Sequence, residues 1–333
     1  MTATPARKRR RPLITGCVSL VAIAVATLAI VGYVWGPSAA IVFTGSPHYP
    51  FPPTPQKYAK DVIRAAGLAG IYASSDEFAS ARKDALEQIK GASSYEDTYG
   101  PLREVVKAAG GKHSDILPPG SESDEGAAPA PPTVVPRGDI AIATVPEVSR
   151  HDDSQGYANR LTDGILAHAR CGAVVDLRGN GGGDMGPMLA GLSPLVPDGV
   201  ALSFVGPGRT ADVTVNGNAV TGGGTAVTTH GGKRQVPVAV LVDASTASSA
   251  EATMLAFRGL ESSRSFGVPT AGYASANIAV DLHDGATMLL TTAKDKDRTG
   301  EEFAEDPIAP DVASDNAEAD ALSWLEEQGC SPA

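Results

Sequence analysis

The sequence predicts an α/β fold with mixed α and β elements, in which helices flank a central sheet. Segments 139–145, 173–177 and 236–242 are short, apolar and rich in β-branched residues, which is typical of strands buried on both faces. Segment 156–169 has helical composition, and the strand-helix-strand order implies a right-handed parallel unit. With 42 % apolar residues among 333, the chain can build a large core.

The first 35 residues have the pattern of a membrane anchor. Five consecutive basic residues, 7–11, precede an uncharged segment, 13–35, that is long enough to span a bilayer. The positive-inside rule then places 1–12 in the cytoplasm and the rest of the chain outside the cell, as a single-pass protein of the cell membrane. Two alternatives stay open: a signal peptide cleaved near Ser38, and a lipoprotein acylated at Cys17, although almost no apolar segment precedes that cysteine.

Next come a linker and a small helical subdomain. We assign 36–54 as the linker between the anchor and the next domain, because it contains five prolines. Its conformation is expected to be a proline-rich loop over 38–55. Apolar residues at helical spacing predict three helices in a subdomain that spans 55–112. Segment 113–138 is expected to be a loop, because most of it is low in complexity and too polar to bury, as in a mobile flap or a simple linker. The three predicted helices are 56–69, 75–89 and 94–109.

The remaining residues, 139–333, form the predicted core and its cap. Short alternating segments separated by Gly and Asn predict a β-hairpin excursion within 200–234. A second hairpin, with a turn at 283–285, is expected over 277–292, and a closing helix over 316–328.

The charge and cysteine content exclude several classes of function. Five of the 27 basic residues lie in the N-terminal cluster, which leaves 22 against 38 acidic residues and a net charge of about −16 outside the membrane. This charge argues against nucleic acid and is compatible with a cationic peptide. No His/Cys cluster has metal-ligand spacing, so we expect no metal. We also expect no cofactor and a monomeric protein. Cys171 and Cys330 can form a disulfide in an oxidising compartment.

Two turns that follow predicted strands are candidates for chemistry. The segment from Asp243 to Glu251 contains four small hydroxyl residues between a strand and a helix, where a serine is exposed beside free N–H groups. The alternative is helix capping. The segment from Arg178 to Met185 contains glycines that can present backbone N–H groups to an anion, and it lacks the Lys and Ser/Thr of a phosphate loop.

A histidine is the third candidate. His113 directly follows the Gly-Gly that ends the third predicted helix, so it lies on a loop and is not held in an apolar stripe. It has the best setting of the six histidines for a catalytic base, and the alternative is a solvated loop residue.

Three segments together resemble the S41 family of serine peptidases. They are 175–183 (VDLRGNGGG), 240–251 (ending in TASSAE) and 308–311 (IAPD). The resemblance implies an S41 protease-like core and places the nucleophile at Ser248. The chain departs from the main family because 117–136 is too short for a PDZ domain, and because Tyr273 occupies the position of the usual lysine base.

These departures resemble the branch of nisin resistance proteins, which share the TASSAE motif, the Thr-Ala-Gly-Tyr turn and a Gly-Gly-Lys-His-Ser segment. The branch implies a Ser248/His113 dyad that cleaves a lanthionine-bridged antimicrobial peptide near its C-terminus. We further expect oxyanion N–H groups from Ser249 and Gly183. A general C-terminal processing protease and a non-catalytic, peptide-sequestering protein are the alternatives. Substrate contacts are expected from Asp184, Met185 and Tyr273.

Overall fold

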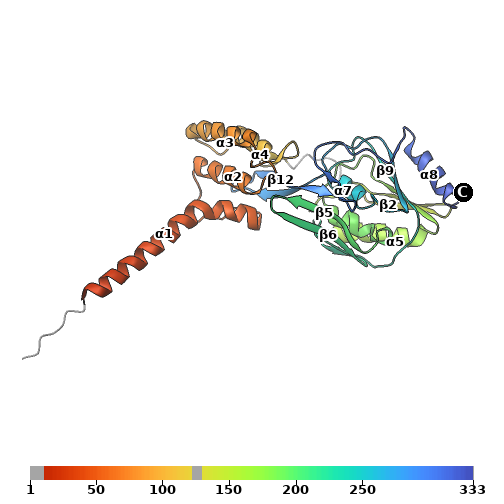
Figure 1. Cartoon of the computed structure of the whole chain (residues 1–333), viewed down its shortest axis with the longest axis horizontal. Helices are drawn as coiled ribbons and strands as arrows, with labels where there is room; N and C mark the ends of the chain where they lie inside the picture. Colours follow the sequence, from red (N-terminus) through yellow and green to blue (C-terminus); the bar gives the residue numbers. More distant parts are fainter. Residues whose placement is uncertain (1–10, 122–129, 333) are drawn as a thin grey trace, which may run out of the picture.

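The computed structural model describes residues 11–121 and 130–332. A long helix projects from one end, a helical subdomain follows it, and an α/β core occupies the other end (Figure 1). This mixed α/β architecture agrees with the predicted fold class.

The core is built on a six-stranded sheet. The strand order is β14-β10-β9-β4-β3-β2, and all neighbours are parallel except β2, which pairs antiparallel with β3. The parallel pairing of β3 with β4, across helix α5, confirms the predicted strand-helix-strand unit. The strands are β2 (Thr133–Arg137), β3 (Ile140–Thr144), β4 (Gly172–Asp176), β9 (Val238–Val242), β10 (Ser263–Gly267) and β14 (Val312–Ala313).

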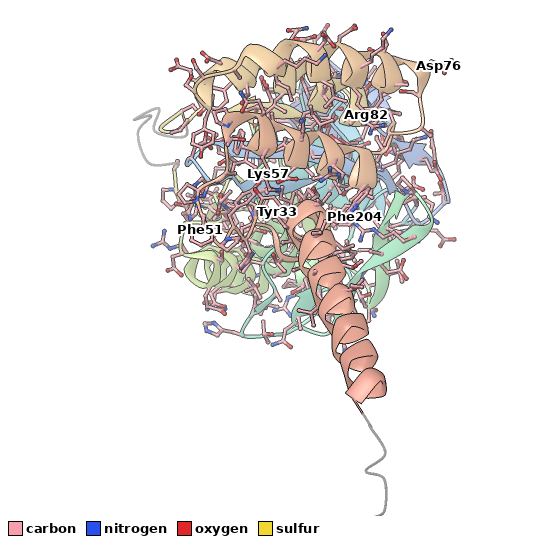
Figure 2. The ribbon with its side chains drawn as sticks, turned by 90° about the vertical axis from the view of Figure 1, so that its left-hand side faces the viewer. Tyr33, Phe51, Lys57, Asp76, Arg82 and Phe204 are labelled. Atoms are coloured by element: carbon pink, nitrogen blue, oxygen red, sulfur yellow. A yellow bond between two sulfur atoms is a disulfide. The ribbon has the colours of Figure 1, made fainter. Side chains whose placement is uncertain are left out.

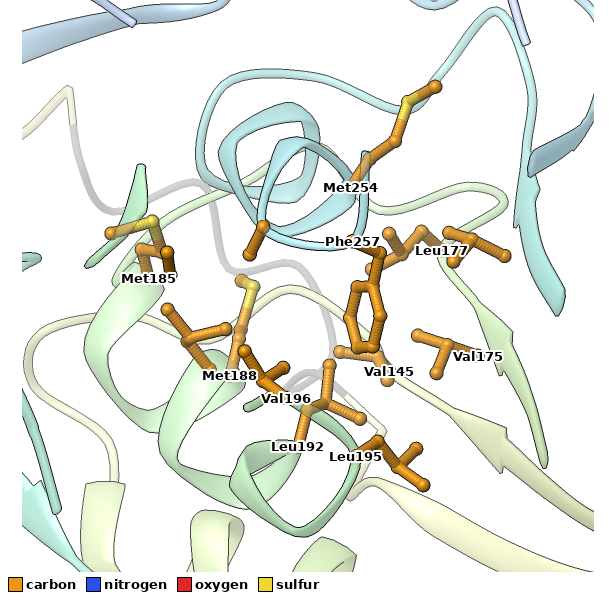
Figure 3. Packing of buried hydrophobic residues seen from close by; sticks show 14 of the residues in the cluster. Val145, Val175, Leu177, Met185, Met188, Leu192, Leu195, Val196, Met254 and Phe257 are labelled. Atoms are coloured by element: carbon orange, nitrogen blue, oxygen red, sulfur yellow. The ribbon is translucent and has the colours of Figure 1, made fainter. Parts of the chain in front are cut away.

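Helices cover both faces of this sheet. Because successive side chains of a strand point to opposite faces, Val240 packs on one side and Leu241 on the other. The first face is covered by α5 (Ser154–His168), α6 (Met185–Gly191) and α7 (Ser249–Leu255), and the second by α8 (Ala317–Glu327). Met185 and Met188 of α6, Met254 of α7 and Val175 of β4 belong to one buried cluster (Figure 3). This packing fixes the starts of α6 and α7 relative to each other.

The two predicted hairpins join into one second sheet. Its strand order is β1-β12-β5-β6-β7-β8, and β11 and β13 also pair with β12. The 277–292 hairpin is confirmed as β11 and β12, and the 200–234 excursion as β5 to β8. The strands are β1 (Asp115–Leu117), β5 (Gly199–Gly206), β6 (Arg209–Asn216), β7 (Ala219–Thr221), β8 (Val227–Thr228), β11 (Ser275–Asp281), β12 (Thr287–Lys296) and β13 (Glu302–Phe303).

The predicted loop 113–138 is partly wrong. It contains β1, which pairs with β12, and β2, which pairs with β3 along the edge of the core sheet. Val134 packs against the main core, so a segment that looks polar overall supplies an edge strand. Residues 122–129 of the predicted loop lie outside the described residues.

The three predicted helices of the subdomain are observed, but their core is not self-contained. Val280, Met288 and Leu290, from the distant β11–β12 hairpin, share one hydrophobic cluster with the helices. Strand β12 runs on to pair with β5, and therefore ties the subdomain to the rest of the molecule. The helices are α2 (Pro55–Ala69), α3 (Asp76–Gln88) and α4 (Glu96–Gly110).

Helix α1 (Arg11–Thr44) continues past the predicted anchor boundary, so the loop expected from residue 38 begins only after Thr44. The extension is stabilised because Ser38 and Ile41 are buried against the subdomain. Arg64 of α2 also donates to the carbonyl of Val34. Residues Ile23–Thr44 are apolar and long enough to cross a membrane. Figure 2 shows α1 leaving the domain beside Tyr33 and Lys57.

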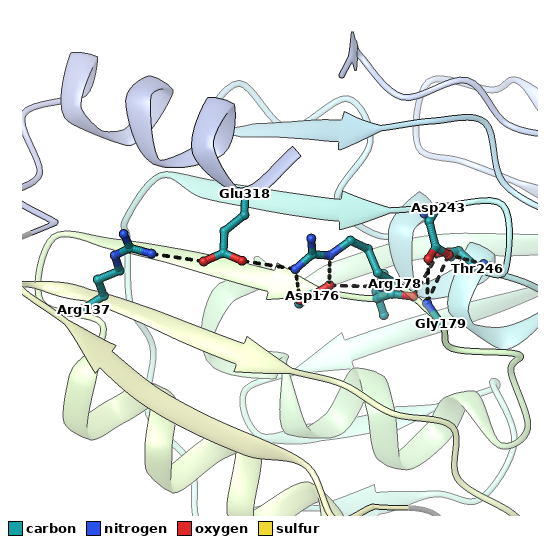
Figure 4. A network of polar contacts seen from close by, with 8 residues as sticks. Arg137, Asp176, Arg178, Gly179, Asp243, Thr246 and Glu318 are labelled. Carbon is teal, nitrogen blue, oxygen red and sulfur yellow. Dashed lines mark hydrogen bonds and ion pairs between the residues drawn. The ribbon is translucent and has the colours of Figure 1, made fainter. Parts of the chain in front are cut away.

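A disulfide and an ion pair attach the C-terminal helix α8 to the core sheet. Cys171 and Cys330 form a disulfide. Arg178, from the Asp-Leu-Arg-Gly segment, donates to both carboxylate oxygens of Asp176 at 2.8 and 2.6 Å and reaches Glu318 of α8 at 3.3 Å (Figure 4). This arginine therefore holds α8 against the core sheet.

Candidate active site

Ser248 lies at the start of α7 in a strained backbone conformation. Its φ of 54° and ψ of −118° make it the single non-glycine residue with positive φ among residues 11–121 and 130–332. Such a conformation costs on the order of 1–3 kcal/mol and persists only where surrounding contacts enforce it. The strain marks Ser248 among the four hydroxyl residues of the turn.

The turn before Ser248 is held by a carboxylate and a hydroxyl. Asp243 accepts hydrogen bonds from the N–H groups of Ser245, Thr246 and Gly179, the last at 3.1 Å (Figure 4). The Thr246 hydroxyl donates to the carbonyl of Leu177 at 3.0 Å. These bonds join the turn after β9 to the glycine segment after β4.

Glu251 supplies the contacts that enforce the conformation of Ser248. The carboxylate is fully buried, and Oε2 accepts the N–H of Ser248 at 2.8 Å and that of Tyr273 at 2.7 Å. Oε1 accepts the N–H of Gly272 at 2.9 Å and the hydroxyl of Thr270. One side chain thus links the turn that contains Ser248 to the Thr-Ala-Gly-Tyr turn.

The glycine segment lies directly against Ser248. A Cβ on Gly182 would lie 2.9 Å from the Cβ of Ser248 and 3.2 Å from the nitrogen of Ser249, so only glycine permits this approach. Asn180 holds the segment by accepting the Gly182 N–H at 2.8 Å and donating to a buried carbonyl. The Ser249 hydroxyl donates to the carbonyl of Gly183 at 2.6 Å. Within the described chain, the N–H groups of Gly183 and Ser249 make no hydrogen bond, so both can receive an oxyanion.

His113 is positioned by the second sheet. Its Nδ1 lies 3.0 Å from the hydroxyl oxygen of Ser275, and its carbonyl accepts from Asn277. The ring of Tyr273 meets the imidazole edge to face, with centroids 5.1 Å apart. Burial, and to a smaller extent the Lys112 ammonium, lowers the pKa of His113 to about 4. The imidazole is therefore neutral at pH 7 and able to accept a proton.

A cavity of about 880 Å³ opens beside the nucleophile turn. Its walls include Ser248 and four other predicted site residues, Ser249, Gly183, Asp184 and Met185. His113 and Tyr273 do not line the cavity. Ser275 connects His113 to the cavity, because it lines the wall and also contacts the imidazole. Both Ser248 and His113 belong to the part of the chain that the structure describes, and there no hydrogen bond joins their side chains.

Two predicted substrate contacts have structural roles as well. Asp184 caps α6 by accepting the Gly186 N–H, and also accepts the Thr225 N–H, both at 3.0 Å. Tyr273 packs on His113, and the ammonium of Lys112 lies 4.4 Å from the centroid of its ring.

The sequence interpretation assigned no role to Glu251 or Ser275. Glu251 lies three residues after Ser248 inside the recognised motif, so its position could have indicated a role. Ser275 is separated from His113 by 162 residues, and no local pattern connects them.

The chain is similar to known proteins over most of its length. The family model for peptidase family S41 matches residues 139–314. The nisin-resistance protein of Lactococcus lactis subsp. lactis is 35 % identical over 317 residues, which cover 93 % of this chain and 96 % of that protein. A lipoprotein from Streptococcus agalactiae has a similar structure, with a TM-score of 0.76 and 27 % identity over 84 % of this chain and 99 % of that one. The photosystem II D1 C-terminal processing protease shares the fold, with a TM-score of 0.56 and 16 % identity over 79 % and 94 % of the two chains.

Proposed function

Because this chain belongs to peptidase family S41, we propose that it is a serine endopeptidase with Ser248 as nucleophile and His113 as base. The observation that carries the proposal is the strained Ser248, seated between a cavity and two free backbone N–H groups. A hydroxyl is a poor nucleophile at neutral pH and needs a base. The neutral imidazole of His113 is suited to that role.

In the proposed mechanism, Oγ of Ser248 attacks the scissile carbonyl carbon and its proton passes to Nε2 of His113. The negative oxygen of the tetrahedral intermediate accepts hydrogen bonds from the N–H groups of Ser249 and Gly183. The C–N bond then breaks, and His113 returns the proton to the leaving amine. Water, activated by the same imidazole, hydrolyses the acyl-enzyme.

The Ser248–His113 hydrogen bond forms, in this proposal, when a peptide occupies the cavity. Catalytic hydrogen bonds often tighten only in the substrate complex. In the tautomer that this step requires, Nδ1–H donates to the hydroxyl oxygen of Ser275, which leaves the lone pair of Nε2 to accept the Ser248 proton. Ser275 is therefore the proposed positioning residue for the base.

The proposed substrate is a cationic, lanthionine-bridged peptide of the nisin type, cut near its C-terminus. The support is the nisin-resistance relative and the acidic balance of the chain, with 38 acidic against 27 basic residues. Met185 and Asp184 line the cavity and are proposed to contact the peptide. Tyr273 lies behind the imidazole, and would contact a peptide that extends over His113.

We also propose that the chain is a monomer anchored in the cell membrane by α1, with its N-terminus cytoplasmic and its catalytic part extracellular. The support is the apolar Ile23–Thr44 segment, whose first half is exposed, and the basic residues that precede it.

The test is incubation of the full chain in detergent with nisin, followed by mass spectrometry. The wild type is expected to release a C-terminal fragment, and the Ser248→Ala variant to release none. Ser245→Ala, an exposed serine in the same turn, is the matched control and should cut like the wild type. Intact nisin beside cleavage of an unbridged peptide would indicate a general processing protease. Equal protection of cells by Ser248→Ala would indicate sequestration.

A further inference from the structure

Asp295 is a buried acid on the wall of the catalytic cavity that the proposed mechanism does not use. It lies on β12 and is 1 % exposed. Its Oδ1 has no hydrogen-bond partner, and its side chain makes no hydrogen bond or ion pair within residues 11–121 and 130–332. An unsatisfied buried polar atom is destabilising, so such an atom in a native site calls for a functional explanation.

Asp297, two residues further along, shows what a structural buried acid looks like in this fold. It is also buried, at 3 % exposure. Its Oδ1 accepts from the N–H groups of Thr299 and Glu301, and its Oδ2, which accepts no hydrogen bond, is compensated by the guanidinium of Arg258 at 3.3 Å. Asp295 has no such partners, and it lines the cavity, which Asp297 does not.

Aromatic residues flank Asp295 in the sheet, and no ion pair joins it to a cation in the described part of the chain. Its cross-strand neighbours are Phe204 on β5 and Phe303 on β13. Burial, and to a smaller extent repulsion from the buried Glu251, raises the pKa of Asp295 well above its usual range. An incoming cation would stabilise the charged form of the carboxylate and so lower this pKa.

The other charged groups of the cavity wall are already engaged or exposed. Asp184 is bonded to two backbone N–H groups, and Arg150 pairs with Asp281 at 3.5 Å. Glu147 is exposed to solvent. Among the described wall residues, Asp295 is therefore the single buried carboxyl that makes no hydrogen bond or ion pair.

We infer that Asp295 forms a subsite for a basic side chain of the peptide, lysine or arginine, next to the scissile bond. The aliphatic stem would lie along Phe204 and Leu289, which line the same cavity, and the charged end would pair with the carboxylate. The inference rests on the proposed peptidase function, and adds to it a preference for a basic residue at one position.

The first experiment needs no variant of the enzyme. Peptides that carry lysine, acetyl-lysine or norleucine at each position flanking the cleaved bond are compared by kcat/KM with the full chain. At one position, lysine should exceed both neutral analogues by about tenfold or more, because they leave the buried acid unpaired. Equal rates at every position would overturn the inference.

The second experiment identifies the residue. In Asp295→Asn, kcat/KM should be about equal for the lysine and norleucine peptides, because the charged partner of the lysine is gone. The kcat/KM on the norleucine peptide should stay within about threefold of the wild-type value. Asp297→Asn is the matched control, expected to lower Tm and to keep the preference. A preference retained in Asp295→Asn would overturn the assignment.

A binding measurement separates this inference from the proposed activity. The full chain carrying Ser248→Ala is titrated with the lysine and norleucine peptides by calorimetry. Tighter binding of the lysine peptide, lost on adding Asp295→Asn, supports the subsite even if the wild type cuts neither peptide. Absence of cleavage by the wild type would count against the proposed function alone, and equal affinity of the two peptides would count against the subsite.

Discussion

Replacing Glu251 tests whether one buried carboxylate holds the site together. Its two oxygens accept four hydrogen bonds, from the N–H groups of Ser248, Gly272 and Tyr273 and from the Thr270 hydroxyl. Glu251→Gln keeps the shape and exchanges one acceptor oxygen for an amide that can only donate. Glu251→Ala removes all four acceptors and leaves the donors buried.

The loss of unfolding free energy can be worked out from the hydrogen bonds that each variant breaks. In Glu251→Gln, the amide nitrogen can take the Oε1 side, where the Gly272 N–H loses its acceptor and the Thr270 hydroxyl, which already accepts the Ile308 N–H, must turn away from the amide. One unsatisfied buried donor costs about 1–3 kcal/mol, so unfolding free energy should fall by that amount. Glu251→Ala leaves at least three N–H groups unpaired and should cost about 4 kcal/mol or more. Ser248 also loses the contact that enforces its positive φ.

Urea unfolding followed by circular dichroism measures both effects, together with kcat/KM on a cleaved peptide. We expect the glutamine variant to stay active at reduced stability and the alanine variant to be inactive. Glu261→Gln, at an exposed position, is the control and should match the wild type. Wild-type stability of Glu251→Ala would refute the reasoning, because four buried bonds would then contribute nothing.

Three further predictions concern the base, the glycine segment and the disulfide. Because the pKa of His113 is lowered to about 4, kcat/KM should stay constant as the pH falls and decline only near pH 4, where the imidazole becomes protonated. A decline near pH 6.5 would contradict a buried imidazole. Gly182→Ala places a Cβ 2.9 Å from that of Ser248 at a φ of 111°, so peptide cleavage should fall at least about a hundredfold, and wild-type rates would contradict the close approach. Reducing the Cys171–Cys330 bond, which spans 159 residues, should cost about 3–5 kcal/mol of unfolding free energy, and an unchanged urea midpoint with dithiothreitol would contradict a stabilising role.

Local patterns in the sequence predicted most elements of the fold. The β-branched segment at 238–242 is a buried strand, and Ser75 caps its helix by accepting the N–H of Phe78. These features depend on residues close in sequence, where periodicity and capping chemistry act. The same reasoning missed the extension of α1 to Thr44, because the helix is stabilised there by burial of Ile41 against distant residues.

The site was predictable only as separate segments. The motif containing Ser248 and the glycine segment after β4 were each recognisable, and the structure places them in contact. The contacts that orient His113 were not recognisable, since the Ser275 hydroxyl lies against it across 162 residues. The buried Asp295 was also missed, because its surroundings come from three strands that no local pattern connects.

The central claim is that Ser248 is a nucleophile activated by His113. The most direct measurement is covalent labelling of the full chain with a fluorophosphonate probe, followed by peptide mapping. We predict a single labelled residue, Ser248, with a labelling rate reduced about a hundredfold or more in His113→Ala and unchanged in Ser245→Ala. Labelling at another serine, or a His113→Ala variant that reacts at the wild-type rate, would contradict the assignment.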